Sequence, residues 1–195
     1  MNEYAIDGYK VTVKEEKGFD LHSDYSKNYD AVFIIEEPDL EDGWFHKIIS
    51  IRVESESAIK NVLIMASYHT IVDKCAALAG EQLFMLLNDV MILFDPADLK
   101  ITKQKELGLI MGTMIAVYSY KDDFIVHYEM DIMRIDRELN VKWDFGGSDI
   151  FVCWQSNDPA FVMKEDRICL YDFNEHYYEI DYDGNKICDI KSENE

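Results

Sequence analysis

The sequence predicts an all-β protein, mainly antiparallel, and three observations support this fold class. Short runs in which apolar and polar residues alternate recur along the 195-residue chain, whereas helical periodicity is scarce. Gly, Asn and Asp separate these runs, as expected for tight turns. Two long segments in the second half of the chain repeat one plan of strands and turns. Together these features predict a meander of blade-like β-hairpin units.

The first third of the chain is predicted to form an N-terminal β segment over residues 1–66. The stretch "YKVTVKEE" alternates, with Val11 and Val13 on one face. The stretches "AVFIIEE", "FHKIISIRVES" and "NVLIMAS" are short, rich in β-branched residues and bounded by polar residues. Residues 15–30 carry no such pattern, and we expect a loop there.

The stretch "KCAALAGEQLFMLLNDVMILFD" is the segment that could most readily form a helix instead of strands, because alanine and leucine favour helices. Gly80 interrupts it, and Asn88 and Asp89 interrupt it again. This spacing fits tight turns between short runs better than one continuous helix. We therefore predict three short strands.

The two repeated segments are "ELGLIMGTMIAVYSYKDDFIVHYEMDIMRIDRELNVKWDF" and "AFVMKEDRICLYDFNEHYYEIDYDGNKICDI". Each contains a strand, an acidic turn, a second strand and a strand that ends in Ile-Asp before another turn. Three polar residues of the first copy, Asp136, Asn140 and Asp144, match Asp181, Asn185 and Asp189 at a constant spacing. An earlier copy, "EQLFMLLNDVMILFDPADLKITKQKEL", fits the plan more loosely. A four-stranded unit of roughly 40–45 residues has the size of a propeller blade.

The hairpins "MRIDRELNVKWDF" and "YEIDYDGNKICDI" resemble those of quinoprotein-like β-propeller repeats, over residues 75–190 at most. The resemblance implies blade-like sheets and carries over no catalytic residues. Two and a half blades cannot close a ring, because propellers take about four or more. We expect an open or incomplete propeller-like arrangement, a sandwich, or an assembly of copies, and the oligomeric state stays open. One domain is expected over residues 1–195, with the blade-like region over 67–195.

The charge balance limits the partners of the protein. The chain has 39 acidic and 19 basic residues, a formal net charge of −20. A surface this negative repels phosphate, so nucleic acid and anionic membranes are not expected as partners. The beginning of the chain has neither the basic nor the apolar region of a secretory signal, and we expect a cytoplasmic protein. These features favour a non-enzymatic, acidic interaction module that binds a basic protein partner.

No metal or cofactor is expected. The stretch "DYDGN" beginning at Asp181 resembles a calcium loop, but Lys186 stands where an EF-hand requires glycine, and Leu139 replaces Gly184 in the sister copy. Asp-Gly between alternating runs is instead typical of a hairpin turn. The five histidines are dispersed and the four cysteines form no CxxC pair, so no zinc site is predicted.

Cys75, His69 and Asp73 are the candidates for catalysis, because they are residue types used in thiol chemistry and lie within "SYHTIVDKC". A nucleophilic cysteine needs a base within hydrogen-bonding distance and a lowered pKa. No cysteine-protease signature surrounds Cys75. The alternative is a turn that leads into a strand. A small hydrolase or thiol enzyme is the second alternative function.

Four aromatic residues, Trp44, Phe45, Trp143 and Trp154, are candidates for a ligand or partner surface. Aromatic residues beside Asp or Asn are common in sugar and peptide sites, which makes a small-ligand or carbohydrate-binding module the first alternative function. Trp143 and Trp154 suit core anchors equally well. The Gly146-Gly147 pair is predicted to let the chain pass from one blade-like unit to the next.

Overall fold

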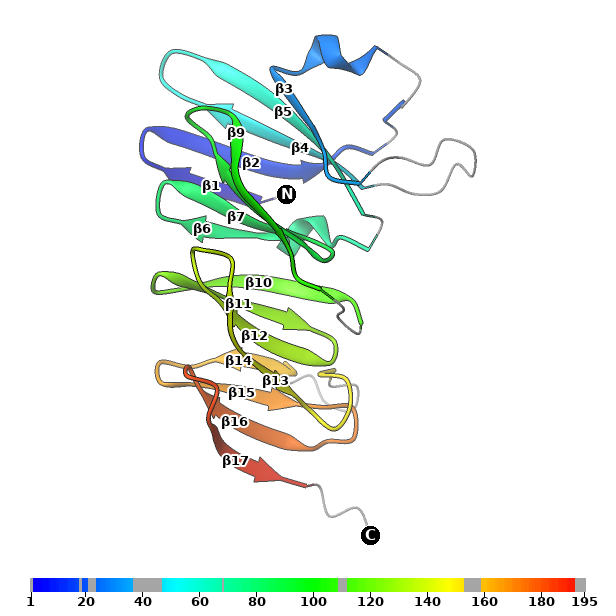
Figure 1. Cartoon of the computed structure of the whole chain (residues 1–195), viewed down its shortest axis with the longest axis vertical. Coiled ribbons are helices and arrows are strands. Elements are labelled where there is room, and N and C mark those ends of the chain that lie inside the picture. The colour runs from blue at the N-terminus through cyan, green and yellow to red at the C-terminus, as the bar shows by residue number, and fades with distance from the viewer. Residues whose placement is uncertain are drawn as a thin grey trace.

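A computed structural model describes residues 2–17, 19–20, 24–36, 47–67, 69–108, 112–152 and 159–191. These residues form four β-sheets (Figure 1). The N-terminal sheet has five strands in the order β1-β2-β4-β5-β3. Its strands are β1 (Asn2–Ile6), β2 (Tyr9–Glu15), β3 (Ala31–Ile34), β4 (Lys47–Glu54) and β5 (Ile59–Ala66).

The other three sheets are antiparallel meanders of four strands in sequence order. The first consists of β6 (Ala76–Ala79), β7 (Gln82–Leu87), β8 (Val90–Asp95) and β9 (Lys100–Glu106). The second consists of β10 (Met114–Tyr120), β11 (Asp123–Tyr128), β12 (Asp131–Ile135) and β13 (Val141–Gly146). The third consists of β14 (Phe161–Met163), β15 (Arg167–Tyr171), β16 (Tyr177–Asp181) and β17 (Lys186–Ile190). We call them sheets I, II and III.

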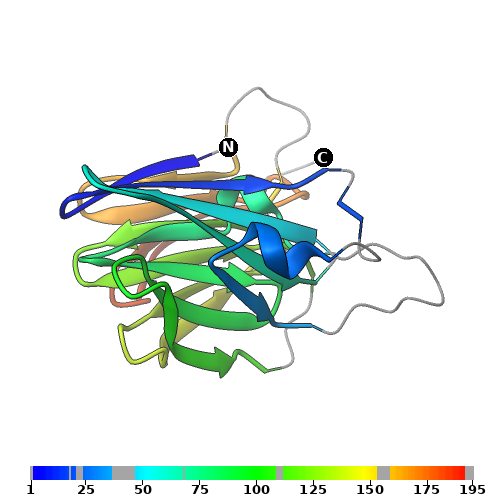
Figure 2. The ribbon, with the colours of Figure 1, turned by 90° about the horizontal axis from the view of Figure 1, so that it is seen from above.

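The four sheets lie face to face and follow the order of the chain along the long axis of the molecule (Figure 1). Seen from above, they lie over one another (Figure 2). The N-terminal sheet is at one end of the stack and sheet III is at the other, so the stack is open. The prediction of an all-β, open propeller-like fold is confirmed.

The sequence underestimated the number of complete blade-like units. It indicated two and a half, whereas sheets I, II and III each have all four strands. The loosely matching first copy is a full sheet because the "AALA" stretch, Ala76–Ala79, supplies its first strand. The three strands predicted within "KCAALAGEQLFMLLNDVMILFD" are confirmed as β6, β7 and β8.

Two details of the N-terminal region differ from the expectation. The stretch expected to be a loop contains a short 3-10 helix, η1 (Tyr25–Asn28). Strand β3, which follows it, pairs with β5 in parallel, whereas β4 pairs with β5 in antiparallel. A second 3-10 helix, η2 (Val72–Lys74), connects the N-terminal sheet to sheet I.

The hairpins matched in sequence are built by the same hydrogen bonds. Asp136 directly follows β12, and Asp181 is the last residue of β16. In each case one carboxylate oxygen accepts hydrogen bonds from the backbone N–H groups two and four residues later, at 2.8–2.9 Å. Leu139 and Gly184 occupy the same left-handed turn position, with φ of 62° and 84°. These carboxylates therefore act as turn caps, and the hairpin prediction for "DYDGN" is confirmed.

The sheets are held together by apolar cores between their faces. One cluster of buried residues continues from the N-terminal sheet through sheet I to the near face of sheet II. In this cluster the rings of Phe84 and Phe124 stack with their centroids 4.1 Å apart. A second cluster, rich in aromatic residues, joins the far face of sheet II to sheet III. At the free end of the N-terminal sheet, Phe19 and Tyr29 pack against a third cluster.

Candidate functional site

The environment of Cys75 suppresses thiolate formation. Its side chain is fully buried, and its Sγ donates a hydrogen bond to the backbone oxygen of Val72 at 3.3 Å. Burial raises the pKa of the Cys75 thiol to about 12. A thiol with this pKa stays protonated at neutral pH, which is the opposite of what a nucleophilic cysteine requires. His69 and Asp73 instead line a cavity beside η2.

Trp143 lies between two sheets and not on an open binding surface. Its indole ring packs on the β16–β17 turn, where a Cβ atom added to Gly184 would lie 2.7 Å from Cγ of Trp143. Its Nε1 donates to the backbone oxygen of Tyr182 at 2.9 Å. This contact favours the core-anchor alternative for Trp143. Trp44, Phe45 and Trp154 lie outside the described residues, and their ligand role stays a prediction.

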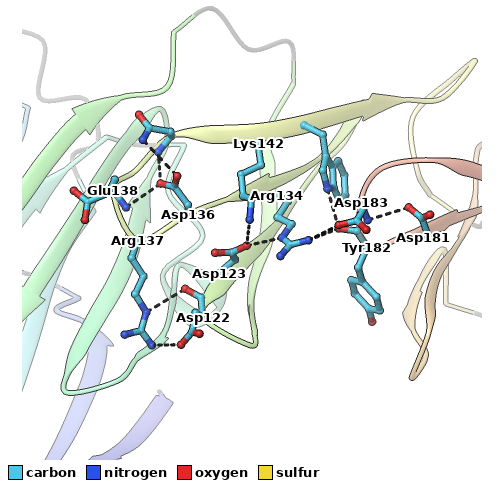
Figure 3. Close-up of polar contacts among 12 residues, drawn as sticks. Asp122, Asp123, Arg134, Asp136, Arg137, Glu138, Lys142, Asp181, Tyr182 and Asp183 are labelled. Carbon is cyan, nitrogen blue, oxygen red and sulfur yellow. Dashed lines mark hydrogen bonds and ion pairs between the residues drawn. The ribbon is translucent and has the colours of Figure 1, made fainter.

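A polar contact between sheets II and III is centred on Arg134 (Figure 3), and Trp143 contributes its bond to Tyr182. The buried carboxylate of Asp123 accepts from Nε of Arg134 at 2.6 Å and from Nζ of Lys142 at 3.0 Å. Nη1 of Arg134 also reaches the backbone oxygen of Tyr182 at 2.6 Å. Burial raises the pKa of Asp123, but hydrogen bonds and attraction from Lys142 and Arg134 outweigh it, so the net shift is downward. Asp123 therefore stays ionised and holds a cation that bridges the sheets.

A second set of polar contacts follows the rim from sheet I to sheet II. The guanidinium group of Arg137 bonds to the backbone and the carboxylate of Asp122 within sheet II, at 3.1 and 3.0 Å (Figure 3). Lys103 of sheet I forms an ion pair with Glu138 at 2.6 Å. The Lys103–Glu138 pair therefore joins the two sheets, whereas the Arg137–Asp122 contact links two turns of sheet II.

A cluster of Ser, His and Asp side chains lies beside sheet III and was not recognised from the sequence. Oγ of Ser148 donates to the buried carboxylate of Asp172 at 2.6 Å and lies 3.2 Å from Nδ1 of His176. The hydroxyl group of Tyr178 also contacts Nδ1 of His176, at 2.9 Å, and Nε2 of the same ring contacts Asp189. Because the shorter contact directs the Ser148 proton to Asp172, the imidazole is not positioned to activate that hydroxyl. The cluster ties the segment after β13 to sheet III.

A cavity with a clear acidic character lies between the β1–β2 turn and sheet I. It measures about 450 Å³ and is lined by three acidic residues, Asp7, Glu81 and Asp95, beside Tyr9 and others. A smaller cavity of about 190 Å³ continues from it and shares Tyr9 as a lining residue. We call the larger cavity the acidic groove.

The acidic groove concentrates unneutralised charge. Asp7 and Glu81 are exposed and form no ion pair with any of the residues that the structure describes. The carboxylate of Asp95 accepts backbone N–H groups of the β8–β9 turn, at 2.9 and 3.2 Å. Among the described residues, no lysine or arginine lines the groove, and Lys60 lines the smaller cavity beside it. The site can attract and hold a cationic group.

Other site types find no support in the described part of the chain. No group of three or more His, Cys, Asp and Glu side chains there is arranged to hold a metal ion. Within the same residues, no helix is long and apolar enough to span a bilayer. Cys75, Cys169 and Cys188 are free cysteines.

Comparison with known proteins identifies only structural relatives. No family model matches the chain, and no curated protein matches it. Dihydro-heme d1 dehydrogenase NirN, solved in complex with DHE, matches with a TM-score of 0.51 and 10% sequence identity. The match covers 76% of this chain and 34% of the NirN chain. BamB from Moraxella catarrhalis has a TM-score of 0.49 and 9% identity over 81% of this chain and 48% of its own. The AfRom2 CNH domain has a TM-score of 0.43 and 12% identity over 76% of this chain and 48% of its own.

NirN is a β-propeller protein, so the resemblance to propeller blades is confirmed at the level of the fold. The chain spans 34% of the NirN chain and 48% of the BamB chain, less than half of either. At these identities the similarity concerns the fold alone. The function of this chain must be argued from its own groove and charge.

Proposed function

We propose that this protein is a non-enzymatic interaction module that binds a basic segment of a protein partner in the acidic groove. The observation that carries the proposal is a cavity of about 450 Å³ lined by Asp7, Glu81 and Asp95 and, among the residues that the structure describes, by no lysine or arginine. The net charge of −20 adds long-range attraction for a cationic partner. Such complementarity increases the rate of association and selects against anionic competitors.

The groove also offers apolar contact beside its carboxylates. Tyr9 and the buried Pro96 line both the acidic groove and the smaller cavity, in which Val53 and Leu99 are further apolar lining residues. A lysine or arginine side chain could thus place its charge near Asp7 and its aliphatic part against Tyr9. The carbohydrate-binding alternative depends on Trp44 and Trp154, and no described contact supports it.

The proposal is tested with a short lysine- and arginine-rich peptide and a glutamate-rich peptide of the same length. Fluorescence anisotropy should detect binding of the basic peptide only, and the affinity should fall steeply as salt concentration rises. The double variant Asp7→Asn/Glu81→Gln should bind the basic peptide about tenfold more weakly, because it removes two nearby charges.

The matched control is Glu106→Gln/Glu165→Gln, which removes the same net charge at exposed positions outside the groove. The control should change the affinity by less than about twofold, as expected for distant, screened charges. Equal losses in the two double variants would show that the overall charge, and not the groove, attracts the peptide. That result would refute the proposed site.

A further inference from the structure

The two ends of the stack of sheets differ in how the chain covers them. At the N-terminal end, Ile48, Leu63 and Met65 form an apolar cluster that is at most 6% exposed, and Phe19 and Tyr29 pack against it. At the other end, the described part of the chain places no strand beyond sheet III (Figure 1). The outer face of sheet III is therefore the open end of the stack.

The strand register shows which side chains of sheet III lie on this outer face. Ile168 and Ile180 belong to the cluster that faces sheet II. Side chains alternate between the two faces of a sheet, so the neighbours of these residues along each strand lie on the opposite face. The apolar and aromatic residues on that face are Val162, Cys169, Tyr171, Tyr177, Cys188 and Ile190. We call it the end face.

The end face combines exposed apolar surface with one ion pair. The rings of Tyr171 and Tyr177 lie with their centroids 4.7 Å apart, and Tyr171 and Ile190 are 37% and 56% exposed. Nη1 of Arg167 donates to Oε2 of Glu179 at 2.7 Å, so the charges of this pair cancel. Exposed apolar surface of this kind is typical of an interaction site.

The pair of charges makes the end face complementary to itself. A two-fold axis brings one patch of a protein against the same patch of a second copy. Arg167 has five N–H donors, so it can also approach Glu179 of the second copy while it keeps its own contact. A chain of net charge −20 repels a second copy over most of its surface, and this repulsion is weakest where charges cancel.

We propose that the end face binds the end face of a second copy of this chain and forms a two-fold symmetric dimer. Association end to end would need the opposite end of the stack, which Phe19 and Tyr29 already cover, so the contact closes at two copies. The strands of sheet III have at most five residues each, so the face measures roughly 15–20 Å on each side. Such an interface is at the small end of specific contacts, and we expect a dissociation constant of about 10–100 µM.

Analytical ultracentrifugation of the full chain tests the dimer. The chain should be a monomer at about 1 µM and mostly a dimer at about 500 µM. Association should strengthen several-fold as salt rises from about 50 to about 300 mM, because salt screens the repulsion between two acidic chains. A monomer at every concentration, species larger than a dimer, or association that weakens with salt would overturn the proposal. Binding of a basic peptide in the acidic groove should instead weaken with salt, so the two proposals can fail separately.

Two variants localise the contact. Tyr171→Glu and Val162→Glu each place an unpaired carboxylate on the end face, and each should weaken association more than about tenfold, because like charges then meet across the two-fold axis. The control Ile59→Glu adds the same charge at a residue of β5 that is 53% exposed, and it should change association by less than about twofold.

Circular dichroism checks that each variant is folded, and if one of the two end-face variants does not fold, the other decides. Association of a folded end-face variant as strong as that of Ile59→Glu would refute the end face as the site of contact.

Discussion

The two faces of strand β11 differ in chemistry although every residue of the strand is buried. The face toward sheet I carries Phe124 and Val126, within one apolar cluster. The face toward sheet III carries Asp123 and His127. Asp123 accepts a hydrogen bond from Arg134, which bridges the two sheets. The ring of His127 stacks on Phe161 of sheet III, with the ring centroids 4.7 Å apart. The buried centre of the first junction is therefore apolar, with the Lys103–Glu138 ion pair at its rim. The buried part of the second junction also depends on charge and on pH.

The largest effect is expected at the apolar junction. Phe84→Ala removes a fully buried ring that stacks on Phe124, and it should reduce the free energy of unfolding by about 3–5 kcal/mol, because a cavity remains. Urea denaturation measures this loss. Ile190→Ala is the control, since Ile190 is 56% exposed, and it should cost less than about 1 kcal/mol. Equal costs would contradict the apolar account of the junction.

The ionic junction should be nearly as sensitive to the loss of one charge. Asp123→Ala removes the buried carboxylate partner of Arg134, whose side chain is 12% exposed, and leaves it only the exposed Asp183 at 3.2 Å, so we expect a loss of about 3 kcal/mol. Its neighbour provides a matched control: Asp122→Ala breaks a pair in which the carboxylate is 86% exposed, and it should cost less than about 1 kcal/mol. Adding Arg134→Met to Asp123→Ala should recover part of the stability. A cost of Asp123→Ala no larger than that of Asp122→Ala would rule out a buried bridge.

His127 should make the second junction sensitive to acid. Burial lowers the pKa of His127 to about 4, whereas an unfolded histidine titrates near about 6.5. Between these pH values the unfolded chain binds a proton that the folded chain does not bind. Stability should therefore fall as pH decreases through this window, by up to about 3 kcal/mol from this residue.

The contribution of His127 is isolated by comparing the wild type with His127→Phe, an aromatic substitution that cannot titrate. The difference between their unfolding free energies should change in favour of the variant as the pH falls from about 6.5 to about 4. The control Ile190→Ala removes an exposed side chain that does not titrate, and its curve should run parallel to the wild-type curve. Parallel curves for the wild type and His127→Phe would mean that His127 is not held neutral by its surroundings.

The smallest effect is expected where the turn of sheet III meets sheet II. Gly184 has φ of 84°, and an added Cβ atom would lie 2.7 Å from Trp143. Gly184→Ala should therefore reduce the free energy of unfolding by about 2 kcal/mol, because it adds both backbone strain and overpacking. Gly8 has φ of 75° with nothing within 4 Å, so Gly8→Ala should show the backbone strain alone, about 1 kcal/mol. Thermal unfolding with tryptophan fluorescence compares the two. If the variants lose equal stability, Trp143 does not pack against this turn.

Much of the fold could be predicted from the sequence, but little of the candidate site could. The alternating runs and the repeated Ile-Asp turns led to the hairpins around Asp136 and Asp181. The acidic groove gave no such signal, because Asp7 and Glu81 lie in two separate turns, Asp95 ends β8, and the three become neighbours only after folding. The parallel pairing of β3 with β5 was also invisible, since strand direction leaves no mark on a short apolar run.

The sequence by itself determined the strands and their turns. Alternation and turn chemistry act between residues a few positions apart, so they can be recognised in the chain without knowledge of its partners. Only the tertiary structure decided what the individual side chains do. The Cys75 thiol is held protonated, Trp143 anchors one sheet to the next, and Thr70 remains buried beside a cavity, because burial and long-range contacts set the cost of a charge or an unpaired hydroxyl.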